Sequence, residues 1–238
     1  MEEFDERIAA ALEQTRVVRA PRQHLATFGS TNLKYYMVTE PVYEETSVPR
    51  SGGAETVLRE GKILARRPEV VTPGYMLRLD GFGDEARRTM EMLALRLGHN
   101  APGLFYTYRN EPGELSIVSG NADGVADNVR DDLDRRSEDL AVVIRGADML
   151  WDVSLLKFIY EFTAASAASN AGEMSASRLL DPDPQMGIPR AGIARIEAMF
   201  REVEGGRLDP AALKQELDRW DLFDRYQDRF LGLFRRRR

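Results

Sequence analysis

The spacing of hydrophobic and polar positions along the chain predicts most of its helices. Apolar residues recur every three or four positions in several segments, which indicates amphipathic helices. These segments are residues 3–15, 84–97, 121–135, 148–168, 190–203, 210–217 and 218–234. The widest apolar face belongs to residues 148–168, so we expect this helix to lie in the core.

Strands are predicted where β-branched and aromatic residues gather. Residues 33–43 indicate a strand ending near Pro41, and residues 140–144 fit either strand or helix. Two antiparallel hairpins are also predicted, and Gly61 can adopt the positive φ that the turn of the first requires. The first pairs residues 56–59 with 62–65, and the second pairs residues 104–108 with 115–118 across residues 109–114.

Together these elements predict an α+β fold, with short antiparallel hairpins packed with helices and a small all-helical C-terminal part. Residues 164–177 are mainly small or polar, and residues 181–189 carry three prolines and a glycine. Prolines continue neither a helix nor a central strand. We therefore predict an α+β domain over residues 1–180, a linker over residues 181–189 and a helical subdomain over residues 190–238.

Composition narrows the chemistry that the chain can perform. It has no cysteine and only two histidines, His24 and His99. This removes thiol nucleophiles, thiolate metal sites, disulfides and most imidazole acid–base chemistry. We expect no metal site, no cofactor and a cytosolic location. The bias toward arginine over lysine fits a GC-rich bacterial genome, and the alternative is selection for bidentate contacts with anions.

Net charge and hydropathy restrict the partners. The formal net charge of −6 argues against attraction of the whole molecule to nucleic acid or to an anionic membrane. The most apolar stretch, residues 149–162, is interrupted by charges and is too short to span a bilayer.

Two glycine-containing patterns partly match ligand-binding motifs, and capping explains both better. Residues 81–86 follow the spacing of a dinucleotide-binding loop, but Thr72 and Pro73 indicate a preceding helix rather than a strand. Residues 119–124 begin like a calcium loop, but a cation, Arg130, occupies the position that requires a bidentate glutamate. We expect Asp84 to cap one helix, and Asn121 or Asp123 to cap another.

Two clusters of charged residues also have structural explanations. Asp127, Asp131 and Asp134 share a helical face, but arginines interleave with them, as on a solvated surface. Glu60 and Lys62, with Glu40 upstream, superficially resemble a nuclease core. A lysine so close to a predicted turn is poorly placed for a rigid site.

The second predicted hairpin carries a candidate ligand site. Tyr106 and Tyr108 alternate onto one face, Arg109 follows them, and Lys34 lies on the earlier strand. Such residues can line a small-molecule pocket or stack on bases. The alternative is a half-buried sheet with a polar turn.

The C-terminal helix carries a candidate interface. Trp220, Phe223, Phe230 and Phe234 recur at helical spacing, so they must pack against their own domain, a second subunit or a partner. The chain then ends in four arginines that suit phosphate contacts, namely Arg235, Arg236, Arg237 and Arg238.

These features favour a cytosolic protein that works by binding, as a scaffold or regulatory subunit that contacts a protein partner or another copy through its helical C-terminal part. Catalysis is uncertain, and no residue has an assigned chemical role. One alternative is an RNA- or ribosome-associated factor that uses the arginine tail. Another is a small-molecule enzyme with a pocket of tyrosine, arginine and carboxylate groups.

Overall fold

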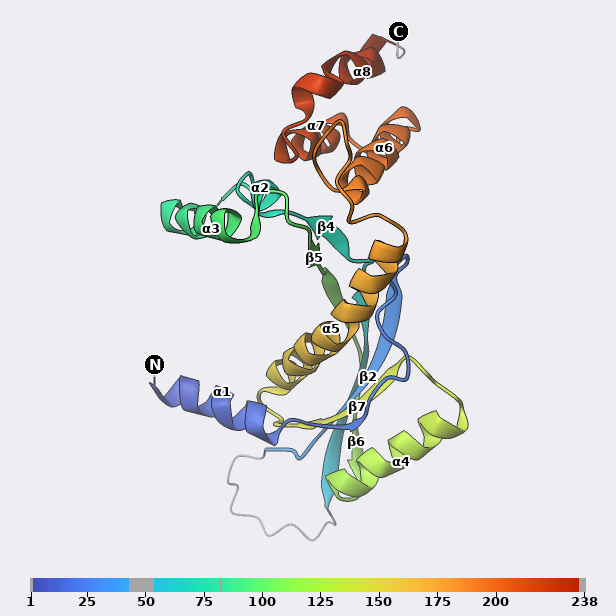
Figure 1. Ribbon diagram of the computed structural model, residues 1–238. Helices are drawn as coiled ribbons and strands as arrows, with labels where there is room; N and C mark the ends of the chain where they lie inside the picture. The colour runs from blue at the N-terminus through green and yellow to red at the C-terminus, as the bar shows by residue number, and fades with distance from the viewer. Residues whose placement is uncertain (1, 43–53, 82, 236–238) are drawn as a thin grey trace. The chain divides into compact units, whose positions relative to one another are not determined.

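The computed structural model describes residues 2–42, 54–81 and 83–235, without the side chains of residues 2–4 and 235. Its internal contacts divide the chain into two compact units (Figure 1). Unit 1 comprises residues 1–67 and 106–170, and unit 2 comprises residues 68–105 and 171–238. The division differs from the predicted boundary at residue 180, because each unit is assembled from two separate stretches of chain.

Unit 1 is built on a five-stranded sheet with the order β1-β7-β2-β3-β6. Its strands are β1 (Arg16–Arg19), β2 (Thr31–Thr39), β3 (Glu55–Ala65), β6 (Tyr108–Ser119) and β7 (Ala141–Gly146). β2 and β7 run parallel, and every other neighbouring pair is antiparallel. The short strand β1 and the long strand β6 therefore form the two edges of the sheet.

Helices cover both faces of this sheet (Figure 1). α4 (Ala122–Arg135) packs on one face against Val38 and Leu58, and α5 (Trp151–Ala176) packs on the other against Leu33 and Met37. Alternate residues of β2 thus serve two apolar cores, as expected for a central strand. α1 (Glu2–Gln14) precedes β1. The α+β class is confirmed, and Asn121 caps α4 by accepting from the Gly124 amide at 2.7 Å, as predicted.

The first predicted hairpin is wrong, because β3 is one continuous strand over residues 55–65. Gly61 lies in its middle, opposite Tyr35 of β2. A Cβ atom at this position would collide with the Tyr35 ring. The glycine therefore provides space for a buried aromatic side chain rather than a turn.

The second predicted hairpin is wrong for a related reason. β6 runs without a turn through residues 109–114, and Pro112 lies within it. An edge strand tolerates proline, because the missing N–H would otherwise face away from the sheet. The register between β3 and β6 shifts between Arg59 and Gly61, so Gly113 belongs to a bulge and approaches the Glu60 carbonyl.

Unit 2 is mostly helical. Its described residues contain the last turns of α5, a two-stranded antiparallel sheet and five further helices: β4 (Glu69–Val71), β5 (Gly103–Phe105), α2 (Pro73–Met76), α3 (Asp84–Leu97), α6 (Arg190–Glu204), α7 (Pro210–Arg219) and α8 (Phe223–Arg235). Thr72 caps α2 as predicted, whereas Gly83 occupies the cap position of α3 in place of Asp84. The predicted helix over residues 218–234 begins later, because Asp221 adopts a positive φ of 60° between α7 and α8.

The predicted linker is structured inside unit 2. Pro182 and Pro189 form an isolated β-bridge, and the Asp183 amide donates to the Ile188 carbonyl at 2.7 Å. Ile188 is buried in the core of this unit beside α6 and α7. In the part of the chain that the structure describes, no helix has the length and apolar character needed to cross a lipid bilayer.

Candidate functional site

A polar pocket of about 870 Å³ lies in unit 1, where the parallel strands β2 and β7 end. In open sheets, ligands bind at the carboxyl ends of parallel strands. α1, the start of β1, the residues after both strands and the first turn of α4 supply the charged side chains of the pocket, which are Arg7, Glu13, Arg16, Glu40, Asp123, Arg145 and Asp148.

Most of these charges are already paired. Arg145 contacts Glu40 at 3.0 Å and Asp123 at 3.3 Å, and Arg16 contacts the same oxygen of Asp123 at 2.9 Å. Arg7 and Glu13 form no ion pair with any residue that the structure describes. The pocket therefore combines fixed ion pairs with one cation and one anion that are exposed to solvent.

Asp148 anchors the inner wall of this pocket. Its Oδ1 accepts from the Thr39 hydroxyl and from Arg59 Nη1, both at 2.7 Å, and the carboxylate and guanidinium side chains are only 13 % and 17 % exposed. Burial alone would raise the pKa of Asp148. The hydrogen bonds from Thr39 and Arg59, with the positive charge of Arg59, outweigh burial and hold the pKa below its ordinary value.

Replacing Asp148 by asparagine is expected to lower the free energy of unfolding of unit 1 by about 2 kcal/mol at neutral pH, because a charged hydrogen-bond partner of Arg59 is lost. Because the pKa of Asp148 is lower in the folded protein, its carboxylate stabilises the fold fully at pH values above its ordinary pKa of 3.8. This contribution is lost as the pH falls through the folded-state pKa. Urea denaturation at several pH values should show the two proteins converging in acid.

The matched control is Asp127→Asn, because Asp127 is an exposed carboxylate paired with Arg130 on the surface of α4. It should change the unfolding free energy by less than about 0.5 kcal/mol. A difference between wild type and Asp148→Asn that stays constant from neutral pH to about pH 2 would contradict the linkage to Asp148 ionisation.

The structure divides the predicted tyrosine and lysine residues between two faces of the sheet. The Tyr106 hydroxyl donates to Asn170 at 2.8 Å and that of Tyr108 bonds to Thr163, so both engage α5. Lys34 instead pairs with Glu138 at 3.0 Å, on the side of α4. These three residues do not form one site.

Arg109 and Lys34 have separate surroundings. Arg109 is exposed and pairs with Glu111 of its own strand. Lys34 lines a shallow pocket of about 450 Å³ whose other polar members include Tyr36, Glu60 and Lys62. Burial and the nearby Glu60 carboxylate raise the pKa of Tyr36, which keeps its hydroxyl protonated.

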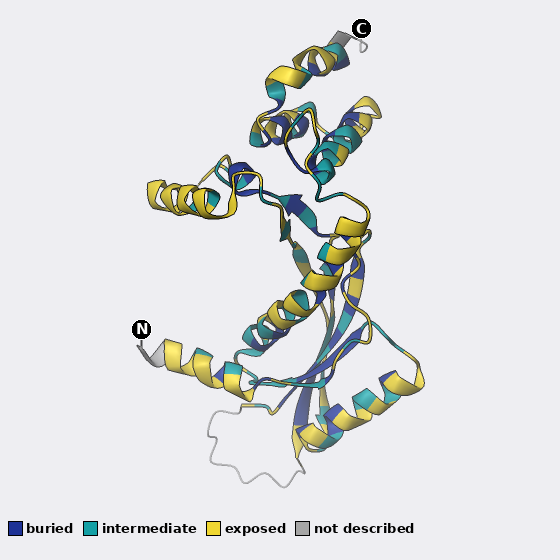
Figure 2. Cartoon of the chain, in the orientation of Figure 1, coloured by how far each residue is buried: buried dark blue, intermediate teal, exposed yellow. Residues whose placement is uncertain are grey.

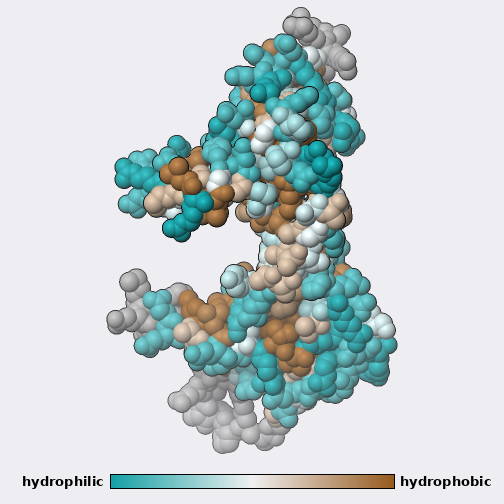
Figure 3. Space-filling model, in the orientation of Figure 1, coloured by the Kyte–Doolittle hydropathy of each residue, from teal (hydrophilic) through white to brown (hydrophobic). Residues whose placement is uncertain are grey.

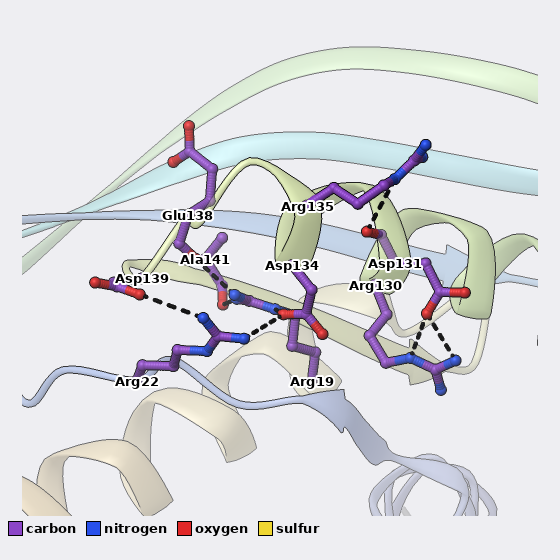
Figure 4. Close-up of polar contacts among 9 residues, drawn as sticks. All are labelled: Arg19, Arg22, Arg130, Asp131, Asp134, Arg135, Glu138, Asp139 and Ala141. Carbon is purple, nitrogen blue, oxygen red and sulfur yellow. Dashed lines mark hydrogen bonds and ion pairs between the residues drawn. The ribbon is translucent and has the colours of Figure 1, made fainter.

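The acidic face of α4 is used by arginines, as Figure 4 shows. Arg130 contacts Asp127 at 2.6 Å and Asp131 at 2.9 Å. Asp134 accepts from the buried Arg19 at 2.8 Å, and this hydrogen bond lowers the pKa of Asp134. Arg22 reaches the same Asp134 oxygen at 3.0 Å. Among the described residues no group of acidic or imidazole side chains is arranged to hold a metal ion.

Arg19 gives the ion pairs on the acidic face of α4 a structural role. Its guanidinium also donates to the carbonyls of Ala141 and Glu138, both at 2.7 Å. Arg19 belongs to β1, so these bonds fasten the edge strand to the turn between α4 and β7 (Figure 4). The acidic face thus has a structural role in positioning β1.

The aromatic stripe of the C-terminal segment lies largely inside unit 2. Trp220 and Phe230 are buried in its core, Phe223 is half-buried against that core, and Phe234 is the most exposed of the four. Arg235 is the last residue of α8. Arg236, Arg237 and Arg238 lie outside the described residues, so phosphate contact by the tail stays a prediction.

The least covered element of unit 2 is α3. None of its residues, all of which the structure describes, is buried. Met92, Leu95 and Leu97 are 64 %, 88 % and 58 % exposed. Figure 2 shows the helix almost entirely in the colour of exposed residues, and Figure 3 shows hydrophobic residues at its surface.

A narrow apolar groove runs between α3 and α2. It has a volume of about 210 Å³, close to that of one large apolar side chain, and is lined mainly by Met76, Leu77, Leu79, Ala86 and Met90. A helix of this length is marginal in water unless an apolar face is packed. We therefore regard α3 as the candidate binding element, with the groove on one side and the exposed Met92 and Leu95 on another, and we name these two sides together the α3 surface.

The sequence held a signal for this surface that the helical pattern alone did not reveal. The predicted face of residues 84–97 contains Met90, Leu93, Ala94 and Leu97. Met92 and Leu95 lie on the other side of the helix, which makes it apolar on more than one side. Apolar side chains on a second side of a surface helix indicate a further face that another surface can cover.

Comparisons with models of protein families, with curated proteins and with solved structures find no match to this chain. Its function is therefore inferred from its own residues.

Proposed function

We propose that the protein is a non-catalytic binding protein that holds a protein partner through the α3 surface of unit 2. The observation that carries this proposal is the exposure of Met92, Leu95 and Leu97 on a helix with no buried residue. Met92 and Leu95 lie about one turn apart on the same side of α3, and neighbouring exposed apolar side chains of this kind mark interaction sites on folded proteins. The helical part of the chain is thus the proposed contact, with α3 rather than α8 at its centre.

The chemistry of the surface defines the kind of partner. The groove beside Met90 accommodates one large apolar anchor, as when an amphipathic helix inserts into a groove. Arginines and carboxylates flank the apolar side chains, including Arg88, Glu91 and Arg96. A polar rim around an apolar centre is the usual arrangement of a protein interface.

The test is a pair of matched substitutions followed by reconstitution. We expect Met92→Asp with Leu95→Asp to abolish capture of a partner that wild-type protein retains on purification, because both aspartates would be desolvated in the interface. Leu156→Asp on α5 is the control, since Leu156 is 64 % exposed but lies outside the α3 surface. The captured protein is then purified and titrated against all three chains by calorimetry.

Binding that is lost in the α3 variant and kept in the control supports the proposal. Equal binding by the α3 variant and wild type would overturn it. A complex containing only further copies of this chain would assign the α3 surface to self-association instead, and the mass of the complex distinguishes this outcome.

A further inference from the structure

The outer edge of β6 has one protected half and one unprotected half. Natural edge strands are protected by charges, prolines and bulges that prevent pairing with another strand. The first half of β6 has all three, in Arg109, Glu111, Pro112 and the bulge at Gly113. Residues 115–119 have none, and Leu115 and Ile117 are 58 % and 62 % exposed.

Backbone hydrogen bonds show which residues face outward. The Gly120 amide donates to the Ala54 carbonyl at 2.7 Å, on the side of β3. Backbone groups that point toward and away from the neighbouring strand alternate along an antiparallel strand. The N–H and C=O groups of Ser116 and Val118 therefore also point toward β3. The N–H and C=O groups of residues 115, 117 and 119 therefore point away from the sheet, where no described strand pairs with them.

The first half of the strand confirms this assignment independently. The Arg66 amide donates to the Thr107 carbonyl at 3.0 Å, so the backbone N–H and C=O groups of residues 107, 109 and 111 point toward β3. Pro112, which has no N–H, then falls at an outward position, where proline removes no bond to β3. The bulge opposite Glu60 switches the alternation between the two halves.

We propose that residues 115–119 of β6 pair antiparallel with the same residues of a second copy of this chain, with Ile117 on the two-fold axis. The outward groups are spaced evenly about Ile117, so Leu115 of each copy lies opposite Ser119 of the other. Three hydrogen-bonded pairs give about six backbone hydrogen bonds. An interface between identical surface patches must be self-complementary in this way.

Charge and side-chain placement favour a second copy as the occupant. Residues 115–119 carry no charged side chain, so identical segments meet without repulsion. Leu115 and Ile117 lie opposite Arg59 and Val57 of β3. Arg59 stacks over Trp151 of α5 at 5.8 Å, which places these two apolar side chains on the α5 face. Pairing brings the Ile117 side chains of both copies together on that face.

Charge exchange at residue 117 tests the pairing and its register. Sedimentation velocity of the wild type from about 1 to 200 µM should show a monomer–dimer equilibrium, as expected for a small interface. Ile117→Lys and Ile117→Glu should each weaken dimerisation about 10-fold or more, because like charges then face each other at the axis. An equimolar mixture should restore dimers as lysine–glutamate heterodimers.

A second pair of variants separates backbone pairing from apolar contact. Ile117→Pro removes the outward N–H at a position equivalent to Pro112 and should abolish dimers, whereas Ile117→Thr keeps the N–H and should weaken them only a few-fold. Circular dichroism checks that every variant is folded. Met92→Asp with Leu95→Asp should leave the dimer intact, which separates this inference from the proposed function.

A wild type that stays monomeric over this range would overturn the inference. So would folded Lys and Glu variants that fail to associate when mixed although the wild type dimerises.

Discussion

Replacing Glu216 by alanine is expected to lower the free energy of unfolding of unit 2 by about 3–5 kcal/mol, because it removes a buried carboxylate that pairs with the partly buried Arg195 and accepts hydrogen bonds from two buried side chains. Glu216 is only 1 % exposed, in the middle of α7. Arg195 Nε lies 3.0 Å from its Oε1, and Arg195 also pairs with Glu69. Loss of the carboxylate would therefore upset a charge balance that spans α6, α7 and β4.

Two further buried donors depend on the same carboxylate. Trp220 Nε1 donates to Oε1 at 2.9 Å and the Tyr75 hydroxyl donates to Oε2 at 3.1 Å. Burial and the charge of Glu216 raise the pKa of Tyr75, which keeps this hydroxyl a donor. Each donor left unsatisfied adds a desolvation cost, so the effect of Glu216→Ala lies at the upper end for a single substitution.

The control for this prediction lies on the same helix. Asp218 pairs with Lys214 at 2.6 Å on the exposed side of α7. Asp218→Ala should change stability by less than about 0.5 kcal/mol. Unit 2 can be followed alone by Trp220 fluorescence in a Trp151→Phe background, since the chain has only two tryptophans, one in each unit. An unchanged midpoint for Glu216→Ala would show that the network is dispensable.

Replacing Phe158 by alanine is expected to cost unit 1 about 3–5 kcal/mol, the usual loss for deleting a buried phenyl ring. Phe158 is buried on the inner face of α5, stacks on Phe162 at a centroid distance of 5.5 Å and belongs to the core formed with Leu33 and Ile144. Helix positions 148–168 were expected to lie in the core, and for this residue that expectation is confirmed.

Guanidinium denaturation followed by Trp151 fluorescence in a Trp220→Phe background measures this loss. Leu156→Ala on the exposed side of α5 is the control and should stay within about 0.5 kcal/mol of wild type. A midpoint for Phe158→Ala equal to that of the control would remove Phe158 from the core. Since two units need not unfold together, each substitution should act mainly on the transition of its own unit.

Elements with strong local signals were predictable from the sequence. Asn121 and Thr72 are side-chain caps, and each starts a helix where the sequence placed one. β2 was predicted from its β-branched and aromatic content. These signals are local, because a cap or a periodic face is determined by residues within a few positions.

The hairpins and the domain boundary were not predictable, since both depend on residues distant in sequence. Gly61 has the appearance of a turn residue, but its role is set by Tyr35 on the neighbouring strand. Unit 2 joins residues 68–105 to residues 171–238, and no local change of composition marks such an assembly. The prolines of residues 181–189 indicated a linker, because local propensity takes prolines as breaks in structure. The β-bridge between Pro182 and Pro189 is a pairing that such propensity does not encode.

For the candidate site, the sequence predicted which residues could take part but not how they are arranged. The tyrosines, lysine and arginine singled out from the sequence are present, but strand alternation and the position of α5 send Tyr108 and Lys34 to opposite faces. Leu95 is exposed because no described element of unit 2 packs against that side of α3. Such an absence of packing becomes visible only once the tertiary contacts are known.

The interleaved order of the two units has a consequence for synthesis on the ribosome. Every residue of unit 1 has been made once residue 170 is complete, whereas the first half of unit 2 must wait for residues 171–238. Domains tend to fold as units during translation. Residues 68–105 therefore emerge early as an inserted segment, with Val71 and Tyr75 lacking the helical residues that they pack against in the finished protein. During this interval the nascent chain exposes apolar side chains that become covered once residues 171–238 have been made and packed against them.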